Sequence, residues 1–215
     1  TVQRLEAALA ETEQLRRLAG VAERRAVKAT AAEILYNTRD PYARKVIVDK
    51  GTKHGVISGQ PVVDENGVLG QVTRAHPMVA EVTLLTDKDQ AIPVQVVRNG
   101  LRAVAFGSGA SGMLELRFMA SNAEIQNGDR LVTSGIDGTY PPGIPVATVA
   151  RIERDAAYAF ARIVCQPAAG VERGRYVLVI ANEPRLAQPP EEAGAGGDRR
   201  PGKVRKPRRK DGDAT

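Results

Sequence analysis

The polarity pattern of the first 33 residues predicts an amphipathic helix. Apolar or small side chains recur at steps of three and four, while Glu and Arg fill the positions between them. This period is that of a helix with one apolar stripe. The stripe is narrow, which suits pairing with a second helix, so we expect a homodimer contact through its large apolar side chains. These are Val2, Leu5, Leu9, Leu15 and Leu18.

The same helix has alternative roles. The step from Thr12 to Leu15 breaks the heptad phase, and about five turns of Leu pattern are short for a coiled coil, so the helix could instead pack on the chain's own globular part. A helix lying on a membrane surface is disfavoured, because its polar face carries as many acids as bases. Parallel and antiparallel pairing both stay open.

After Pro41 the apolar period changes from that of a helix to two. Short alternating or β-branched runs follow at even spacing, separated by turn sequences such as 64–67 and Asn99-Gly100. This pattern is typical of an all-β barrel or sandwich. The expected strands are 43–48, 68–73, 79–84, 91–97, 103–106, 113–118, 130–133, 146–152, 159–164 and 176–180.

One local pattern occurs three times. An apolar residue is followed three positions later by Gly, and two apolar residues stand at positions six and seven. We expect the first apolar side chain to fill the core, Gly to let the backbone reverse, and the apolar pair to begin the next strand. The copies centre on Gly59, Gly128 and Gly174, which we predict to be structural turn glycines.

These patterns predict a mainly β fold. We expect an N-terminal amphipathic, coiled-coil-like helix with its linker at 1–38, β-barrel subdomains at 39–110 and 111–181, and a disordered tail at 182–215. The glycine-rich run 107–112 is then a flexible joint between the barrels, or alternatively a long hairpin within a single sheet system. The tail is predicted to be disordered because it offers no apolar surface to offset the entropy of ordering.

The net charge of +6 comes mostly from the run 199–210, so basicity belongs to the tail rather than to the fold. Polyanion binding through this tail is an alternative function, since basic residues release counterions from phosphates. The run contains no aromatic side chain on which bases would stack, so we expect no nucleic-acid partner. The favoured interpretation is a solvated tail attracted weakly to any polyanion, and if the chain lies outside the cytoplasmic membrane, anionic lipid headgroups are the nearer partners.

Two further features concern the cell compartment. The single Cys165 excludes an intramolecular disulfide, and its apolar neighbours indicate a buried thiol. No stretch approaches the about 20 apolar residues that span a bilayer. Since the sequence opens with Thr1 directly in a helical pattern, we expect that an upstream segment has been removed.

An enzyme with two β-barrels was the strongest catalytic alternative. His54, Asp87 and Ser134 occur in the order used by chymotrypsin-like serine proteases. Ser134, however, follows Thr133 rather than the glycine that accompanies an oxyanion hole in that class. His54 and His76 also lack the spacing of a zinc site. We therefore expect no enzyme activity, no catalytic residue, no metal and no cofactor.

Three stretches together resemble the extracytoplasmic region of the rod shape-determining MreC family. They are VDKG (48–51) with GV (55–56) and GQPVV (59–63), then GVLGQV (67–72), and then GDRLVTSG (128–135) with YPPGIPV (140–146). Ala147 stands where the family pattern often has Gly, and the basic tail is not a shared feature. The resemblance covers roughly residues 1 to 180, about the size of a two-module region.

The resemblance implies a non-enzymatic scaffold for cell-shape maintenance at the periplasmic face of the cytoplasmic membrane, with a single-pass anchor upstream. It implies homodimers, with filaments where contacts repeat. The implied partners are the MreB system through MreD or RodZ, the elongation transpeptidase (a penicillin-binding protein) and a RodA-type glycosyltransferase. We expect contacts through exposed sheet edges and through Tyr36, Tyr140 and Pro141 as apolar surface residues.

Overall fold

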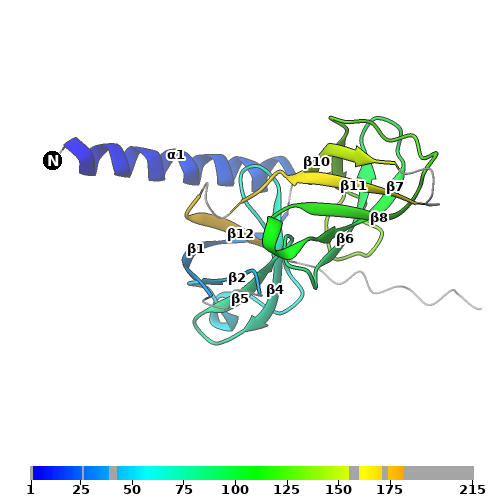
Figure 1. Cartoon of the computed structure of the whole chain (residues 1–215). Coiled ribbons are helices and arrows are strands. Elements are labelled where there is room, and N and C mark those ends of the chain that lie inside the picture. The colour runs from blue at the N-terminus through cyan, green and yellow to red at the C-terminus, as the bar shows by residue number, and fades with distance from the viewer. Residues whose placement is uncertain (1, 26, 39–42, 155–159, 171–173, 182–215) are drawn as a thin grey trace, which may run out of the picture. The chain divides into compact units, whose positions relative to one another are not determined.

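The computed structural model describes residues 2–25, 27–38, 43–154, 160–170 and 174–181 (Figure 1). The described residues form helix α1 (Val2–Arg25), two short 3₁₀ turns, η1 (Thr52–His54) and η2 (Gly109–Ser111), and twelve strands. The strands are β1 (Ala29–Asn37), β2 (Lys45–Val48), β3 (Pro61–Val63), β4 (Val68–Ala75), β5 (Ala80–Leu84), β6 (Ala91–Val96), β7 (Arg102–Gly107), β8 (Leu114–Ala120), β9 (Arg130–Thr133), β10 (Pro145–Glu153), β11 (Phe160–Pro167) and β12 (Tyr176–Ile180).

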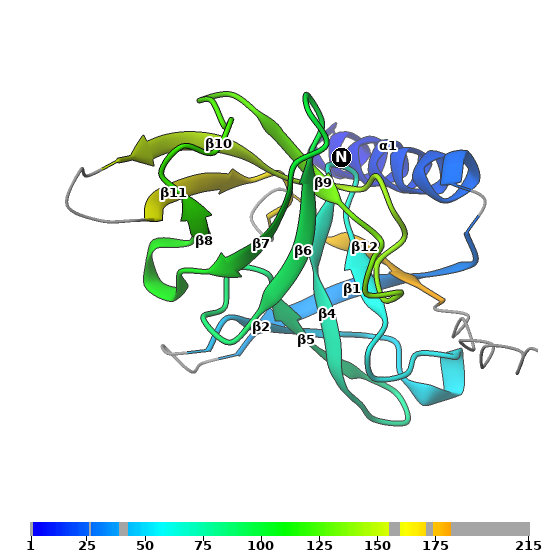
Figure 2. The same ribbon diagram turned by 90° about the vertical axis from the view of Figure 1, so that its right-hand side faces the viewer.

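The strands close into two six-stranded barrels. Barrel 1 has the strand order β1-β12-β3-β4-β5-β2, and barrel 2 has the order β10-β11-β8-β7-β6-β9. Barrel 2 is built from consecutive strands, whereas barrel 1 receives its last strand, β12, from beyond barrel 2 (Figure 2). The mainly β fold with an N-terminal helix and two barrels is thereby confirmed. Because both barrels are closed, the described strands offer no open edge, and the expectation of exposed sheet edges was wrong.

The boundaries differ from the prediction at the helix end. Residues 29–37, expected as helix and linker, form β1, which pairs with β2 and β12 and buries Ala32 in barrel 1. The alanines of this segment carried the helical pattern onward in the sequence, but pairing with two strands overrides intrinsic propensity. The expected helix over 1–33 therefore ends at Arg25, and the bounds 1–38 do not describe a separate unit.

The division between the barrels also differs. The chain passes from barrel 1 to barrel 2 between β5 and β6, not near residue 110, and returns to barrel 1 with β12. The glycine-rich run joins the paired strands β7 and β8, so it forms a hairpin, but within barrel 2 rather than within a single sheet system. Gly107 is needed there for close packing, since a Cβ on it would lie 1.9 Å from the carbonyl oxygen of Asp87.

The glycine turns predicted from the repeat are equivalent in the two barrels. Gly59 and Gly128 have φ of +93° and +87°, a backbone conformation that glycine adopts without strain. Each donates its amide hydrogen to a strand carbonyl at 2.8 Å, that of Val72 in barrel 1 and that of Val149 in barrel 2. The apolar residue three positions before each glycine is buried. Two copies of the pattern therefore build the same turn.

The third copy is different. Gly174 has no positive φ. The strand that follows it, β12, pairs with β1 and β3 and so corresponds to β6 of barrel 2, not to β9, the strand that follows Gly128. A Cβ on Gly174 would lie 2.1 Å from Nε2 of Gln14 in α1. This glycine makes room for the helix, and its predicted role as a turn glycine of the same kind was wrong.

The equivalent turns differ in charge. In barrel 1 the side-chain oxygen of Gln60 accepts the Ile57 amide hydrogen at 3.0 Å, and in barrel 2 Asp129 accepts that of Gln126 at 2.9 Å. Asp129 also accepts two hydrogen bonds from Arg98, at 2.8 and 2.9 Å. This guanidinium lowers the pKa of Asp129 below its ordinary value. The stabilisation that the Arg98–Asp129 pair gives the fold is therefore present above about pH 4 and is lost as the pH falls through the lowered pKa of Asp129.

Asp129→Gln should give the barrel 2 turn the uncharged side chain that Gln60 supplies in barrel 1. We expect the free energy of unfolding to fall by about 1 kcal/mol at pH 7 and by less at pH 3, because only the ionised carboxylate gains from Arg98. Chemical denaturation at both pH values measures this difference. Gln60→Ala is the control and should weaken the fold equally at both. If Asp129→Gln lowered the free energy of unfolding equally at the two pH values, the ionised carboxylate would not be the stabilising form.

The cores of the barrels meet at β12. Val177 and Val179 are buried in the cluster that fills barrel 1. Leu178 and Ile180 are buried in the larger cluster that fills barrel 2 and extends to Leu18 of α1. Since alternate residues of a strand face opposite sides, β12 contributes to both clusters at once. It closes one barrel and lies between that barrel's interior and the helix.

Candidate interaction surfaces

The C-terminal half of α1 packs on the chain's own barrels. Leu18 is 1% exposed and belongs to the shared core cluster. Upstream of it, Gln14 accepts the Arg175 amide hydrogen at 3.4 Å, and Glu11 accepts the hydroxyl hydrogen of Tyr176. For this half, the alternative of packing on the same chain is correct. Leu18 was wrongly assigned to a dimer contact, because it is inaccessible to a second chain.

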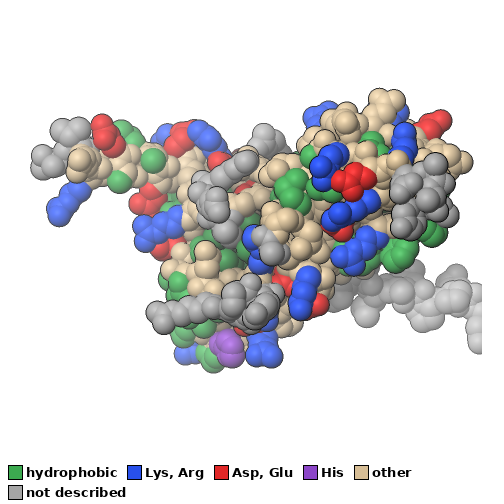
Figure 3. All heavy atoms as spheres, viewed as in Figure 1, with side chains coloured by type: hydrophobic (Ala, Val, Ile, Leu, Met, Phe, Trp, Pro, Cys, Tyr) green, Lys and Arg blue, Asp and Glu red, His purple; other side chains and the backbone are tan. Residues whose placement is uncertain are grey.

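The helix α1 also presents apolar side chains to solvent, on the part that precedes Leu18. Leu9 is 67% exposed and Leu15 39% exposed, and Figure 3 shows hydrophobic and charged side chains interleaved along this part of the helix. Nine residues make two and a half helical turns, so Leu9 lies on the side opposite Leu18. Leu15, three residues before Leu18, lies at the edge between the solvent-facing and the core-facing sides of the helix. Val2 and Leu5 lie in α1, but their side chains fall outside the described residues.

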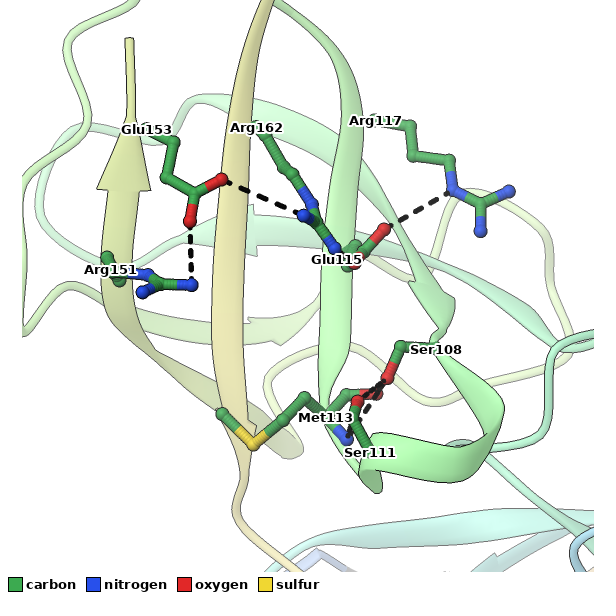
Figure 4. Close-up of polar contacts among 8 residues, drawn as sticks. All are labelled: Ser108, Ser111, Met113, Glu115, Arg117, Arg151, Glu153 and Arg162. Carbon is green, nitrogen blue, oxygen red and sulfur yellow. Dashed lines mark hydrogen bonds and ion pairs between the residues drawn. The ribbon is translucent and has the colours of Figure 1, made fainter.

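A row of alternating charges crosses three strands of barrel 2 (Figure 4). Glu153 binds Arg151 at 2.6 Å and lies 3.8 Å from Arg162. Glu115 binds the same Arg162 at 2.5 Å and lies 3.9 Å from Arg117. The hydrogen bond that Arg162 donates to Glu115 raises the pKa of Arg162 above its ordinary value. Each guanidinium therefore has a carboxylate within 4 Å on the barrel surface.

Two exposed aromatic side chains lie on the same strands. Phe118 is 76% exposed and Phe160 56%, and their rings meet edge to face with centroids 6.3 Å apart. Among described non-glycine residues, only Phe118 has a positive φ, of +60°. It lies at a β-bulge, where Arg117 and Phe118 of β8 stand opposite Arg162 of β11. For a bulky residue this conformation costs about 1–2 kcal/mol. We call Phe118, Phe160, Arg117 and Arg162 together the aromatic surface.

The sequence did not indicate this surface. Leu114 and Leu116 point into barrel 2, and strict alternation would send position 118 inward as well. The bulge instead turns Phe118 outward and places Met119 in the core, where it is 8% exposed. A glycine at the bulge would have been a signal, but the sequence has Phe there.

The three apolar surface residues predicted elsewhere have different environments. Tyr36 on β1 is 60% exposed beside Leu35, so it is accessible, and its contact with a partner stays a prediction. Tyr140 is 3% exposed, and burial raises the pKa of its phenol well above the ordinary value. Its expected place on the surface was wrong, because the ring fills the barrel 2 core. Pro141 is half-buried, and its carbonyl accepts the hydroxyl hydrogen of Thr133 at 2.5 Å.

The residues of the protease alternative are not brought together. His54 accepts the Gly51 amide hydrogen within η1, at 3.2 Å. Asp87 accepts the amide hydrogen of Arg44 at 2.6 Å, and the Ser134 hydroxyl donates to the Pro93 carbonyl at 3.3 Å. Within the described part of the chain, no hydrogen bond joins two of the three. Each is used by its own loop, which gives no support to a catalytic triad.

Other candidate chemistry gains no support from the structure. Among the described residues, no group of three or more His, Cys, Asp or Glu side chains is placed to hold a metal ion. Within the same ranges, no helix has the length and apolar character needed to cross a bilayer. Cys165 is buried, as expected, and burial raises the pKa of its thiol to about 12. The basic run 199–210 and the tail lie outside the described residues.

Comparisons with known proteins agree with the fold. The family model "Rod shape-determining protein MreC, barrel core" matches residues 34–181. The cell shape-determining protein MreC of Escherichia coli K12 is 38% identical over 170 residues, which are 79% of this chain and 46% of that protein. The chain therefore spans less than half the length of this curated relative.

Solved structures give the same result. The crystal structure of MreC from Pseudomonas aeruginosa has a TM-score of 0.68 at 43% identity, covering 72% of this chain and 99% of that one. A complex between penicillin-binding protein and MreC from Helicobacter pylori contains a chain with a TM-score of 0.57 at 22% identity, covering 73% and 99%, a likeness of fold. With the barrel-core match over more than half its length, this chain belongs to the MreC family of rod shape-determining proteins.

Proposed function

We propose that this chain is the extracytoplasmic part of a non-enzymatic scaffold for cell elongation. A single-pass anchor outside this sequence would hold it at the periplasmic face of the cytoplasmic membrane. The observation that carries the proposal is the match of residues 34–181 to the MreC barrel core, whose members are named for determining cell shape. The polar side chains of the protease alternative serve turns and loops, which also favours a binding protein over an enzyme.

We propose that the scaffold joins the MreB system, through MreD or RodZ, to the enzymes that build peptidoglycan. Those enzymes would be a RodA-type glycosyltransferase and the elongation transpeptidase, a penicillin-binding protein. Support for the last partner comes from the Helicobacter pylori complex, in which a protein of this fold is bound to a penicillin-binding protein. Because both barrels are closed, such partners would contact side chains and loops rather than extend a sheet.

Self-association would use the N-terminal half of α1. Leu9→Glu should convert dimers to monomers in sedimentation, raising the dissociation constant about tenfold or more, because it places a charge in an apolar seam. At concentrations at which the parent is monomeric, the melting temperature should not change, since Leu9 is exposed in the single chain. Leu35→Glu, at an exposed Leu of barrel 1, is the matched control and should leave the mass unaltered. A dimer that survives Leu9→Glu would reject pairing through this stripe.

A further inference from the structure

The aromatic surface combines two features that are unfavourable in an isolated chain. Phe118 has a positive φ, which a bulky side chain rarely adopts, and 76% of its surface is exposed to water. Phe160, its edge-to-face neighbour, is also mostly exposed. Glycine would occupy the bulge without strain and without exposing a ring. Among the described residues, the ring contact of Phe118 is with Phe160, which is itself exposed.

Backbone strain of this kind concentrates at functional sites, where the strained residue is held in position for a ligand. Here the bulge aims Phe118 away from the barrel while its neighbour Met119 remains in the core. The two rings together form an exposed apolar patch on the surface of barrel 2. Two adjacent exposed rings supply the apolar area of an aromatic anchor that fills a pocket on a protein partner.

Charge indicates what surrounds such a pocket. Arg117 and Arg162 are 45% and 61% exposed beside the rings, and Arg151 is 68% exposed at the end of the charged row. Glu115 and Glu153 hold these guanidinium groups in place. Among the five described residues of the row, three cations stand against two anions, which leaves one positive charge. Arginines ordered in this way are suited to carboxylates on a partner.

We propose that the aromatic surface docks on a protein partner that presents an apolar pocket with carboxylates at its rim. The inference rests on the proposed function, in which the partner is the extracytoplasmic domain of the elongation penicillin-binding protein. Phe118 and Phe160 fill the pocket, and Arg117 and Arg162 pair with the rim. The face of barrel 2 formed by β8 and β11, rather than α1, is then the transpeptidase contact, which leaves the helix available for pairing.

The test measures binding of the 215-residue chain to the purified penicillin-binding domain at two salt concentrations. Phe118→Gly and Phe160→Ala should each raise the dissociation constant about tenfold or more, as expected for aromatic residues at the centre of an interface. Arg162→Glu should weaken binding and reduce its salt dependence, because it reverses a charge that faces the rim. Phe118→Gly should also melt at the same or a higher temperature than the parent, since it relieves the positive φ.

The matched control is Ile136→Ala, at a residue of barrel 2 that is 66% exposed and lies outside the aromatic surface. It should bind as the parent does. Unchanged binding by Phe118→Gly and Phe160→Ala would overturn this inference and leave the transpeptidase partnership standing. No binding by the parent chain would overturn both. A change in sedimentation mass of the chain alone on Phe118→Gly would identify a second copy as the occupant, which also overturns the proposal.

Discussion

Ending the chain at Gly170, before β12, is expected to unfold barrel 1 while barrel 2 keeps its strands. Barrel 1 loses the strand that joins β1 to β3, and four buried side chains leave the two cores. Each buried aliphatic side chain contributes about 1.5–3 kcal/mol, so the four together contribute roughly 6–12 kcal/mol. That is comparable with the whole stability of a domain, about 5–15 kcal/mol.

Amide hydrogen exchange measures this prediction strand by strand. Amides of β2 to β5 should lose protection, and those of β6 to β11 should retain it, because the pairs of barrel 2 do not include β12. A chain ending at Ala181 is the control: it removes residues 182–215 but keeps β12, and should exchange like the parent. Retained protection in β3 and β4 of the shorter chain would contradict the assignment of β12 as the closing strand.

Leu18→Asp is expected to have the second largest effect. Removing a buried Leu side chain typically lowers the free energy of unfolding by about 2–5 kcal/mol, and an unpaired carboxylate in the same place adds a desolvation penalty. The expected results are a lower denaturation midpoint and loss of protection where α1 meets β12. Leu9→Asp is the matched change on the opposite side of the same helix and should hardly alter stability. Equal effects at the two positions would contradict the two-sided helix.

Much of the fold could be predicted from local patterns. Ten of the twelve strands were expected close to their observed positions, because period-two alternation and turn residues are local properties. The partner of each strand is not local. Nothing in 176–180 says that it closes a barrel begun about 140 residues earlier, and β1 was hidden in an alanine-rich segment. The division into contiguous barrels failed for this reason.

The interaction surfaces were predictable only in part. The Leu stripe and its phase break were visible in the sequence, but which half faced the barrels depended on Leu18 meeting residues of β12. Tyr140 lies in a loop sequence rich in Gly and Pro, which looks exposed, yet tertiary packing buries its ring. Phe118 reversed its direction through a bulge, a change of one residue that the alternation pattern does not reveal.

The position of β12 in the sequence has a consequence for how the protein matures. As the chain is synthesised or exported from its N-terminus, barrel 2 has all its strands before barrel 1 can close. Until residue 180 is delivered, the apolar interior of barrel 1 and the core-facing side of α1 lack the side chains of β12 that cover them. The last strand thus covers the inner side of the first helix, so that the helix is packed on the barrels only in a finished molecule.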